Sequence, residues 1–216
     1  AARINVTLNG IPYNDAESQG TFFVDLPDFS SSINSIQVQR GIGTSSNGAG
    51  AFGATINLST NELNKIKYIS TNNSYGSFNT WKNNIQFGSG LLGKNFTIDG
   101  RVSRISSDGY IDRAKSNLRS FYLSTAFVTK KNSLRFNIFS GKEKTYQAWN
   151  GVAANLLQTD RTHNPSGTEK PGAPYDNEVD DYTQTHYQLF YNHKFNKYWK
   201  GNVAVFLTRG KGYYEQ

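Results

Sequence analysis

From residue 65 onward the chain alternates apolar and polar residues in long segments, and this pattern limits the fold more than any other feature. Leu134, Phe136 and Ile138, for example, alternate with polar neighbours, and Phe139 and Phe190 are the two exceptions to the rule. A period of two is typical of strands with one apolar and one polar face. The pattern predicts about seven strands, and no apolar run approaches the roughly 20 residues that a membrane-spanning helix needs.

The predicted connections between these strands differ in length in a regular way. Short connections are expected at about residues 75–79, 88–95, 129–133 and 195–200, a long one at 106–119 and a very long one at about 142–183. After the first, every second connection is long. Outer-membrane barrels show this asymmetry, whereas sandwiches, in which the apolar face meets a second sheet, have turns of more even spacing.

The composition fits a sheet that is apolar on one face and wet on the other. Only 36% of the residues are hydrophobic, yet 14% are aromatic, which suits a membrane barrel with aromatic girdles. The net charge of +7 comes from scattered Lys and Arg residues. Solubility explains it, with attraction to anionic lipid headgroups or an anionic ligand as the functional alternative. No basic stripe with interleaved aromatic residues points to nucleic acid, and the absence of cysteine leaves no disulfide framework.

The first 60 residues form a separate unit, in which a glycine-rich stretch lies between two strands. We predict strands at about 35–40 and 55–59, with five glycines from Gly41 to Gly53 between them. Because a strand follows, there is no helix N-terminus to hold an anion, and a phosphate-binding loop is disfavoured. Further upstream, Asp28 is expected to cap a single helical turn within residues 28–34.

Two segments of this unit resemble a known family. Ile36-Gln-Val-Gln-Arg-Gly followed by Gly48-Ala-Gly-Ala-Phe-Gly-Ala-Thr-Ile-Asn resembles the closing motif of the plug domain in TonB-dependent outer-membrane transporters, and Asn9-Gly-Ile-Pro-Tyr-Asn-Asp-Ala-Glu-Ser is also similar to that family. Ile42 stands where the family often has proline, and Ala54 where a second glycine is usual. Both departures concern the detail of the loop.

The resemblance implies a mostly β fold in two parts. Residues 1–60 would be the C-terminal part of a plug domain with a small mixed sheet. Residues 61–216 would be the first seven or so strands of an antiparallel transmembrane β-barrel, of 22 strands in the family, with a long extracellular loop at about 142–183. Seven strands are too few to close around a 60-residue insert, so we expect this chain to be an internal piece of a longer protein.

The family also implies a function. We expect TonB-dependent uptake of a scarce nutrient across the outer membrane of a Gram-negative bacterium, with a ferric siderophore or other iron chelate as ligand, because Ser46-Asn-Gly-Ala-Gly-Ala-Phe-Gly is similar to the siderophore-type ending. The implied partners are outer-membrane lipid and TonB with its inner-membrane energy complex, reached through an N-terminal segment outside these residues. No cofactor and no enzymatic activity are expected. The alternatives are a glycan or peptide importer that works with a surface lipoprotein, and a surface adhesin that transports nothing.

The resemblance also suggests where a ligand binds. Plug loops at 18–23 and 45–52 would face outward, and the long barrel loop would add aromatic surface, although the aromatic residues of that loop fit an outer girdle equally well. The candidate ligand residues are Gln19, Thr21, Phe22, Ser46, Asn47, Phe52, Tyr146 and Trp149. Arg40 is expected to pair with carboxylates of the barrel wall, and Asp99 and Arg101 to reach plug groups from that wall.

Other motifs carry little chemistry. Gly88 to Lys94 matches G-x-G-x-x-G, but a strand follows it, so we interpret it as a hairpin turn. Asp176, Glu178 and Asp180 form a weak calcium candidate, and a solvated loop explains them better. His186 and His193 lie seven residues apart on one predicted strand and therefore face opposite sides. No arrangement of residues suggests a catalytic centre.

Overall fold

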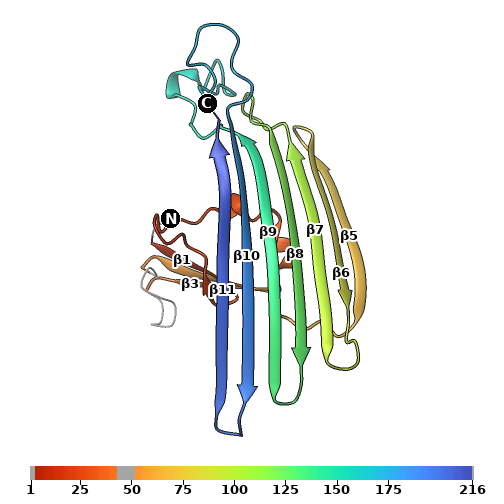
Figure 1. The fold of residues 1–216 in the computed structure, drawn as a ribbon. Helices are drawn as coiled ribbons and strands as arrows, with labels where there is room; N and C mark the ends of the chain where they lie inside the picture. The colour runs from red at the N-terminus through yellow and green to blue at the C-terminus, as the bar shows by residue number, and fades with distance from the viewer. Residues whose placement is uncertain (1–2, 43–51, 216) are drawn as a thin grey trace.

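The computed structural model describes residues 3–42 and 52–215, and its N-terminal part contains a small sheet. The strands of this sheet are β1 (Ile4–Leu8), β2 (Ile11–Pro12), β3 (Ser35–Arg40) and β4 (Ala54–Ser59), in the spatial order β2-β1-β4-β3. β1 runs parallel to β4, while the other two pairs are antiparallel, so the sheet is mixed as predicted. We call residues 3–42 and 52–59 the small-sheet unit (Figure 1).

The rest of the chain forms a second, larger sheet of seven strands. Each strand pairs with its neighbours in the sequence, in antiparallel fashion throughout. The strands are β5 (Lys67–Gly76), β6 (Thr80–Ser89), β7 (Phe96–Ser107), β8 (Ser116–Val128), β9 (Asn132–Tyr146), β10 (Val179–Lys194) and β11 (Lys200–Tyr214). The predicted fold class, a small mixed sheet followed by antiparallel strands of a partial barrel, is confirmed.

The connections at the two ends of the larger sheet differ in length. Residues 90–95, 129–131 and 195–199 make tight turns at one end, and 77–79, 108–115 and 147–178 lie at the other (Figure 1). The longest connection contains the short 3₁₀ helix η4 (Ala154–Leu156). It is shorter than the predicted 142–183, because β9 and β10 continue pairing up to Tyr146 and Val179.

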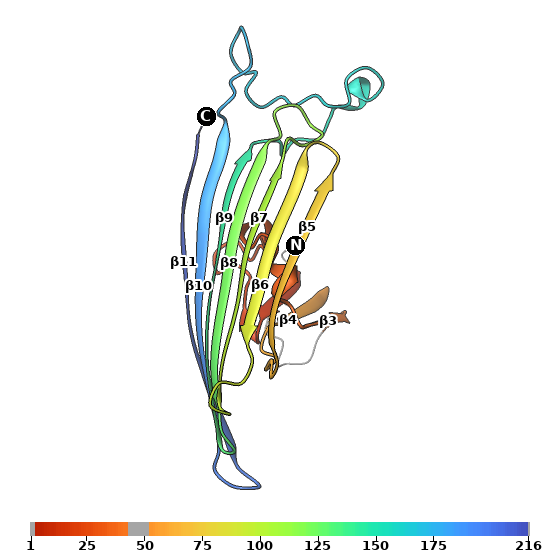
Figure 2. The same ribbon diagram turned by 90° about the vertical axis from the view of Figure 1, so that its right-hand side faces the viewer.

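The two faces of the larger sheet differ as the alternation predicts. Leu134 and Phe136 are exposed on the outer face, whereas Arg135, Asn137 and Phe139 are buried on the inner face. The small-sheet unit lies against this inner face (Figure 2). In the described ranges, no helix is long and apolar enough to cross a membrane.

One hydrophobic core joins the two sheets. Val6, Leu8 and Leu58 of the small sheet belong to it, together with Tyr122 and Phe139 from the inner face of the larger sheet. Phe139, one of the two exceptions to the alternation, is only 1% exposed. Full burial of such a ring stabilises the packing by about 1.5–3 kcal/mol, so this position is apolar because it faces the small-sheet unit and not water.

The chain between the strands of the small-sheet unit carries two 3₁₀ helices, η1 (Phe23–Asp25) and η2 (Phe29–Ser32). The predicted helical turn is therefore present as η2. Asp28 precedes it in the left-handed conformation, with φ 54°, and its side chain makes no capping hydrogen bond. Asp28 thus occupies the predicted N-cap position, but its carboxylate is directed to the larger sheet and accepts from the Ser31 hydroxyl instead of capping a backbone amide.

Candidate functional site

The contact between the small-sheet unit and the inner face of the larger sheet is the candidate functional site, and Asp28 lies at its centre. Its carboxylate is 2.5 Å from Lys82 Nζ and 3.4 Å from an Arg101 guanidinium nitrogen. Asn84 Nδ2 and Ser103 Oγ each donate to it at 2.6 Å. Four side chains of β6 and β7 thus converge on one carboxylate, whose side chain is 1% exposed.

The hydrogen bonds determine the charge of this group. Burial alone would raise the pKa of the Asp28 carboxyl, but hydrogen bonds from Lys82, Ser103, Ser31 and Asn84 outweigh burial and lower the pKa to about 2. Asp28 is therefore ionised at any physiological pH, and its negative charge offsets the buried charge of the surrounding cations.

Arg101 extends this anchor to the neighbouring residues of η2. Its Nε donates to Ser32 Oγ at 2.7 Å, and one terminal nitrogen donates to Ser120 Oγ at 3.0 Å. Gln86 Nε2 donates to the Ser31 carbonyl oxygen at 2.9 Å. Residues 28–32 are consequently held by side chains of β6 and β7, while Ser120 of β8 donates to the carbonyl oxygen of the preceding Pro27 at 2.6 Å.

An aromatic contact lies next to this polar anchor. The Phe29 ring is 5.0 Å from the Phe139 ring and 6.4 Å from the Tyr122 ring, centroid to centroid. Gly141, two residues beyond Phe139, allows the backbone of Asp25 to approach β9, since a Cβ at position 141 would overlap with the Asp25 carbonyl oxygen. The interface thus combines polar contacts with a small apolar centre.

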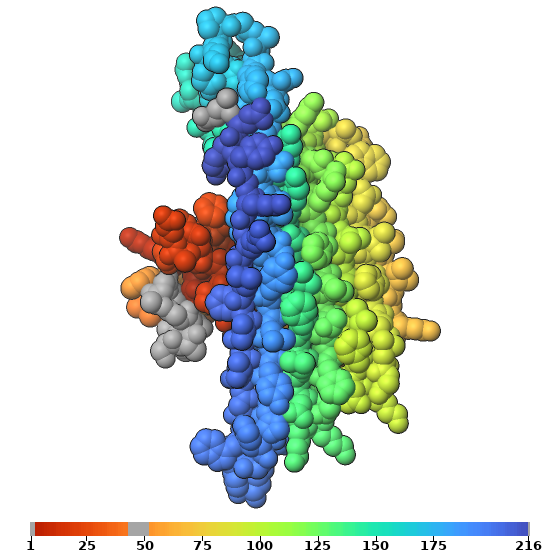
Figure 3. Space-filling view, viewed as in Figure 1, coloured from red at the N-terminus to blue at the C-terminus, as the bar shows by residue number. Residues whose placement is uncertain are grey.

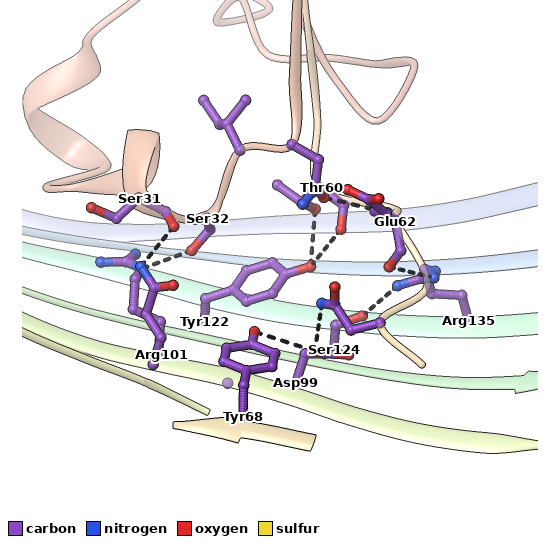
Figure 4. Close-up of a pocket in the computed structure, with 15 residues that line it drawn as sticks. Ser31, Ser32, Thr60, Glu62, Tyr68, Asp99, Arg101, Tyr122, Ser124 and Arg135 are labelled. Carbon is purple, nitrogen blue, oxygen red and sulfur yellow. Dashed lines mark hydrogen bonds between the residues drawn. The ribbon is translucent and has the colours of Figure 1, made fainter. Parts of the chain in front are cut away.

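The segment that links the two sheets is also attached to the inner face. Tyr122 Oη donates to Thr60 Oγ1 at 2.9 Å, an Arg135 guanidinium nitrogen donates to the Glu62 carbonyl oxygen at 3.2 Å, and Asn64 Nδ2 donates to Asp99 at 2.8 Å. These side chains surround a cavity of about 70 Å³ (Figure 4). It is lined by polar groups and large enough for a few water molecules. We call residues 60–64 the linker.

A group of buried carboxyls marks the other side of the interface. Asp25, at the end of η1, meets Glu143 of β9, and both side chains are buried. Burial raises the pKa of the Asp25 carboxyl to about 6; the charge of Asp180 adds to the rise, and a hydrogen bond with Glu143 opposes it. Asp25 therefore resists ionisation, in contrast to Asp28 three residues later.

The candidate ligand residues of the small-sheet unit lie on exposed chain. Gln19 and Phe22 are exposed and Thr21 is half-buried in the loop before η1, and Tyr13 Oη fixes that loop by donating to the Phe22 carbonyl oxygen at 2.7 Å. Phe52 is 67% exposed. Ser46 and Asn47 lie outside the described residues.

Tyr146 and Trp149, the two candidates at the start of the longest connection, have different surroundings. Tyr146 is buried, and its hydroxyl donates to the carbonyl oxygens of Ser166 and Tyr175, so it orders this connection. Trp149 is 62% exposed and packs edge-on against Tyr214 at 5.6 Å. Arg113 of the 108–115 connection also lies over the Tyr146 ring, 5.8 Å from its centroid. These contacts join Tyr146 and Trp149 to the connections and to β11, not to the small-sheet unit.

The structure separates the three residues predicted to join plug and barrel. Arg101 reaches Asp28 and Ser32, and Asp99 reaches the linker. Arg40 is exposed at the end of β3, and none of the ion pairs found in residues 3–42 and 52–215 includes it. The pairing of Arg40 with wall carboxylates stays a prediction, whereas Asp28, which does pair, was predicted only as a cap.

The remaining motifs are quickly placed. Asp176 is exposed, Glu178 is buried and Asp180 is half-buried, and in the described part of the chain no group of three or more His, Cys, Asp or Glu residues is placed to hold a metal ion. The glycine-rich stretch after Gly88 is the turn from β6 to β7, with Gly90 and Gly93 at positive φ.

Solved structures supply the comparison for this arrangement. No family model and no curated protein matches the sequence. The ferric-catecholate import receptor Fiu from E. coli K12 has 17% sequence identity and a TM-score of 0.73, over 97% of this chain and 32% of that one. The pyoverdine receptor FpvA from Pseudomonas aeruginosa has 16% identity and a TM-score of 0.72, over 96% and 30%. The copper transporter OprC has 13% identity and a TM-score of 0.67, over 96% and 30%.

These likenesses define the fold. A small mixed sheet held inside a wall of long antiparallel strands is the plug-and-barrel arrangement of outer-membrane receptors. The fold implied by the resemblance to TonB-dependent outer-membrane transporters, a small mixed sheet with part of an antiparallel barrel wall, is therefore confirmed. The chain spans about a third of the length of the structures that it matches.

Proposed function

We propose that this chain is part of a TonB-dependent receptor that imports a scarce nutrient across the outer membrane of a Gram-negative bacterium. The observation that carries the proposal is the contact between the small-sheet unit and the larger sheet. It rests on the polar inner face through the buried Asp28 carboxylate and its four partners, while the opposite face of the same strands is apolar. A sheet with this polarity suits a lipid-embedded barrel whose lumen is plugged.

The interface also suits a plug that moves. Many of its contacts are hydrogen bonds of polar side chains, to other side chains or to backbone carbonyl oxygens, which water can replace at a net cost of only about 0.5–1.5 kcal/mol each. In the proposed mechanism, ligand binds at the end that carries the longer connections, and TonB with its inner-membrane energy complex pulls an N-terminal segment of the plug. Asp28 and the Phe29 ring are the two contacts that such a movement has to break at greater cost.

We infer an iron chelate such as a ferric siderophore as the ligand. The closing motif around residues 48–53 supports this class, and so do the similar receptors for pyoverdine and ferric catecholate, while a copper transporter among the similar structures shows that the fold also serves another metal. Exposed aromatic and amide groups suit stacking on, and hydrogen bonding to, such a ligand. The proposed contact residues are Gln19, Thr21, Phe22, Ser46, Asn47, Phe52 and Trp149, with Tyr146 positioning the connection that carries Trp149.

Growth under iron limitation tests this function. A strain that lacks the full-length gene is supplied in turn with a panel of ferric siderophores, haem and oligosaccharides, with and without a plasmid copy of the gene. We expect the plasmid to restore growth on one iron source, and only in cells that have TonB. Restored uptake of a glycan or peptide alone would refute the iron assignment, and normal growth of the deletion strain on every source would refute import.

A further inference from the structure

Two buried carboxyl groups face each other where the small-sheet unit meets β9. Asp25, at the end of η1, is 9% exposed and Glu143 is 3% exposed, and a hydrogen bond joins their side chains. An ionised carboxylate can only accept hydrogen bonds, so a bond between two carboxyls requires a proton on one of them. The attached small-sheet unit therefore holds a proton at this contact.

The backbone on both sides keeps the two carboxyls together. A Cβ at Gly141, which lies on the same face of β9 as Glu143, would overlap with the Asp25 carbonyl oxygen, so η1 lies directly on this strand. Ser120 of β8 also donates to the carbonyl oxygen of Pro27 at 2.6 Å. Figure 3 shows the small-sheet unit projecting from behind the larger sheet, well away from both ends of β10 and β11. Both carboxyls are thus largely removed from bulk water while η1 stays in this position.

The neighbouring strands bring no positive charge to this contact. From β10, Asp180 adds a like charge, and Tyr182 lies directly opposite Glu143. From β8 the residue opposite Glu143 is the apolar Leu118. Among the described residues, no ion pair includes Asp25 or Glu143. A second negative charge at this place would therefore meet only repulsion and desolvation.

His186 of β10 and Tyr13 complete the surroundings. The His186 ring stacks on the Phe139 ring, with 4.8 Å between the centroids, and lies 5.7 Å from the Tyr13 ring. Its two nitrogens are 2.9 Å from Gln184 Nε2 and 3.1 Å from Thr208 Oγ1. The Gln184 amide nitrogen can only donate, so the histidine nitrogen that faces it accepts and the ring carries no charge in this arrangement. His186 consequently does not neutralise the two carboxyls.

The anchor at Asp28, three residues further on, has the opposite character. There Lys82 and Arg101 both face the carboxylate, which is ionised. At Asp25 a proton takes the place of the cations, because two interacting carboxyls without a counter-charge ionise one at a time. The raised pKa of the Asp25 carboxyl, about 6, agrees with this geometry.

We propose that the contact between Asp25 and Glu143 is a proton-linked latch: the small-sheet unit takes up a proton when it attaches to β9 and releases it to water when it detaches. The inference rests on the proposed function, since detachment of this unit is the movement that import requires. In water both carboxyls ionise above about pH 4. Attachment is therefore strongest in acid and weakens as the pH rises from about 4 through 6, above which the attached pair has lost its proton too.

Hydrogen exchange in the full-length protein, measured from pH 4 to pH 7, tests the latch. The amides of Asp25 and Leu26 donate to the carbonyl oxygens of Phe22 and Phe23, and they exchange when η1 leaves β9. After correction for the intrinsic effect of pH on exchange, the opening constant should rise about 50-fold over this range. This is the rise expected for one proton that is bound with a pKa of about 6 in the attached state and 3.8 in the detached state.

The variant Asp25→Asn/Glu143→Gln keeps the size of both side chains and removes both acids. We expect its opening constant to rise less than about fivefold over the same range. Asp108→Asn is the matched control, because Asp108 is exposed in the connection after β7, and it should keep the full rise. Asp28→Asn should open more readily at each pH from 4 to 7 and still keep the rise, since the folded pKa of Asp28 lies below this range.

The wild-type profile alone can overturn the proposal, even if the double variant does not fold. An opening constant that changes less than about threefold from pH 4 to pH 7 would do so. A double variant that keeps the full rise would also overturn it. Calcium that tightens the attachment of the wild type at pH 7 as strongly as acid does would show that the carboxyls bind a cation instead, which overturns the latch as well.

Growth on the iron source separates this result from the proposed function. A protein that supports growth but opens independently of pH refutes the latch alone. A protein whose opening depends on pH in the expected way but that supports no uptake refutes the import function and leaves the latch standing.

Discussion

Replacement of Asp28 by asparagine tests the anchor between the small-sheet unit and the larger sheet. The substitution keeps the size of the side chain and removes the charge that faces Lys82 and Arg101. Lowering of the Asp28 pKa from 3.8 to about 2 corresponds to about 2–3 kcal/mol in favour of the ionised form in the folded state. The side chain is 1% exposed, so solvent screens little of this energy. Arg101 keeps its bonds to Ser32 and Ser120, which limits the loss to this range.

Hydrogen exchange in the full-length protein measures this loss. The amides of Ser31 and Ile33 donate to the carbonyl oxygens of Asp28 and Ser30, and these amides become exposed to solvent when residues 28–32 detach. A loss of 2–3 kcal/mol accelerates exchange through that opening by about 30- to 150-fold. Asp15→Asn is the matched control, because Asp15 is exposed and its carboxylate accepts hydrogen bonds from residues of its own loop.

The contribution of Asp28 to stability should change with pH in a defined direction. Because the folded pKa of Asp28 is depressed, its contribution is fully present above the unfolded value of 3.8 and is lost as the pH falls through about 2. The difference between wild type and Asp28→Asn should therefore shrink below pH 4. Exchange rates within threefold of each other at pH 7 would refute the reasoning.

Three further changes probe other parts of the fold. Gly141→Val should destabilise the full-length protein by about 1–3 kcal/mol in urea unfolding, because a Cβ there overlaps with the Asp25 carbonyl oxygen; Gly151→Val, where nothing lies within 4 Å, should change stability by less than about 0.5 kcal/mol. The raised pKa of the Asp25 carboxyl favours the folded state at low pH, so the wild type should lose up to about 3 kcal/mol of stability as the pH rises from about 4 through 6. Asp25→Asn should remove most of this pH dependence. An unchanged slope of stability against pH would contradict this. Tyr146→Phe removes the hydroxyl that holds Tyr175, so limited proteolysis within residues 147–178 should be faster, and an unchanged cleavage rate would argue against that role.

The alternation of apolar and polar residues was sufficient to predict the larger sheet, because a strand places successive side chains on opposite faces whatever else the chain does. It failed at the ends of β9 and β10. Lys142 to Tyr146 and Val179 to Thr183 were predicted as loop, yet they continue the sheet. Glu143 on one face and Tyr146 and Val179 on the other are all buried there. Burial therefore no longer follows the alternation, and pairing continues without a hydrophobic pattern to reveal it.

The anchor could not be predicted from local sequence. Asp28 before Phe29 and Ser31 has the composition of a helix cap, and its partners Lys82 and Arg101 lie more than 50 residues further along the chain. The usable signal was Phe139. An aromatic residue that interrupts a polar face indicates a packed partner on that side, and Phe139 does contact the small-sheet unit.

The parallel pairing of β1 with β4 has a mechanical consequence. β4 leads directly into the linker, whose side-chain contacts fix it to the larger sheet. A pull applied ahead of Ile4 would therefore draw β1 and β4 in opposite directions along their length, and the rungs from Ile4 to Leu8 would share the load in shear. A ladder loaded in shear breaks only when several rungs fail together, whereas the contacts of Asp28 and Phe29 can fail singly. The small sheet would then be carried as one rigid piece, and the bonds to the surrounding strands would yield first.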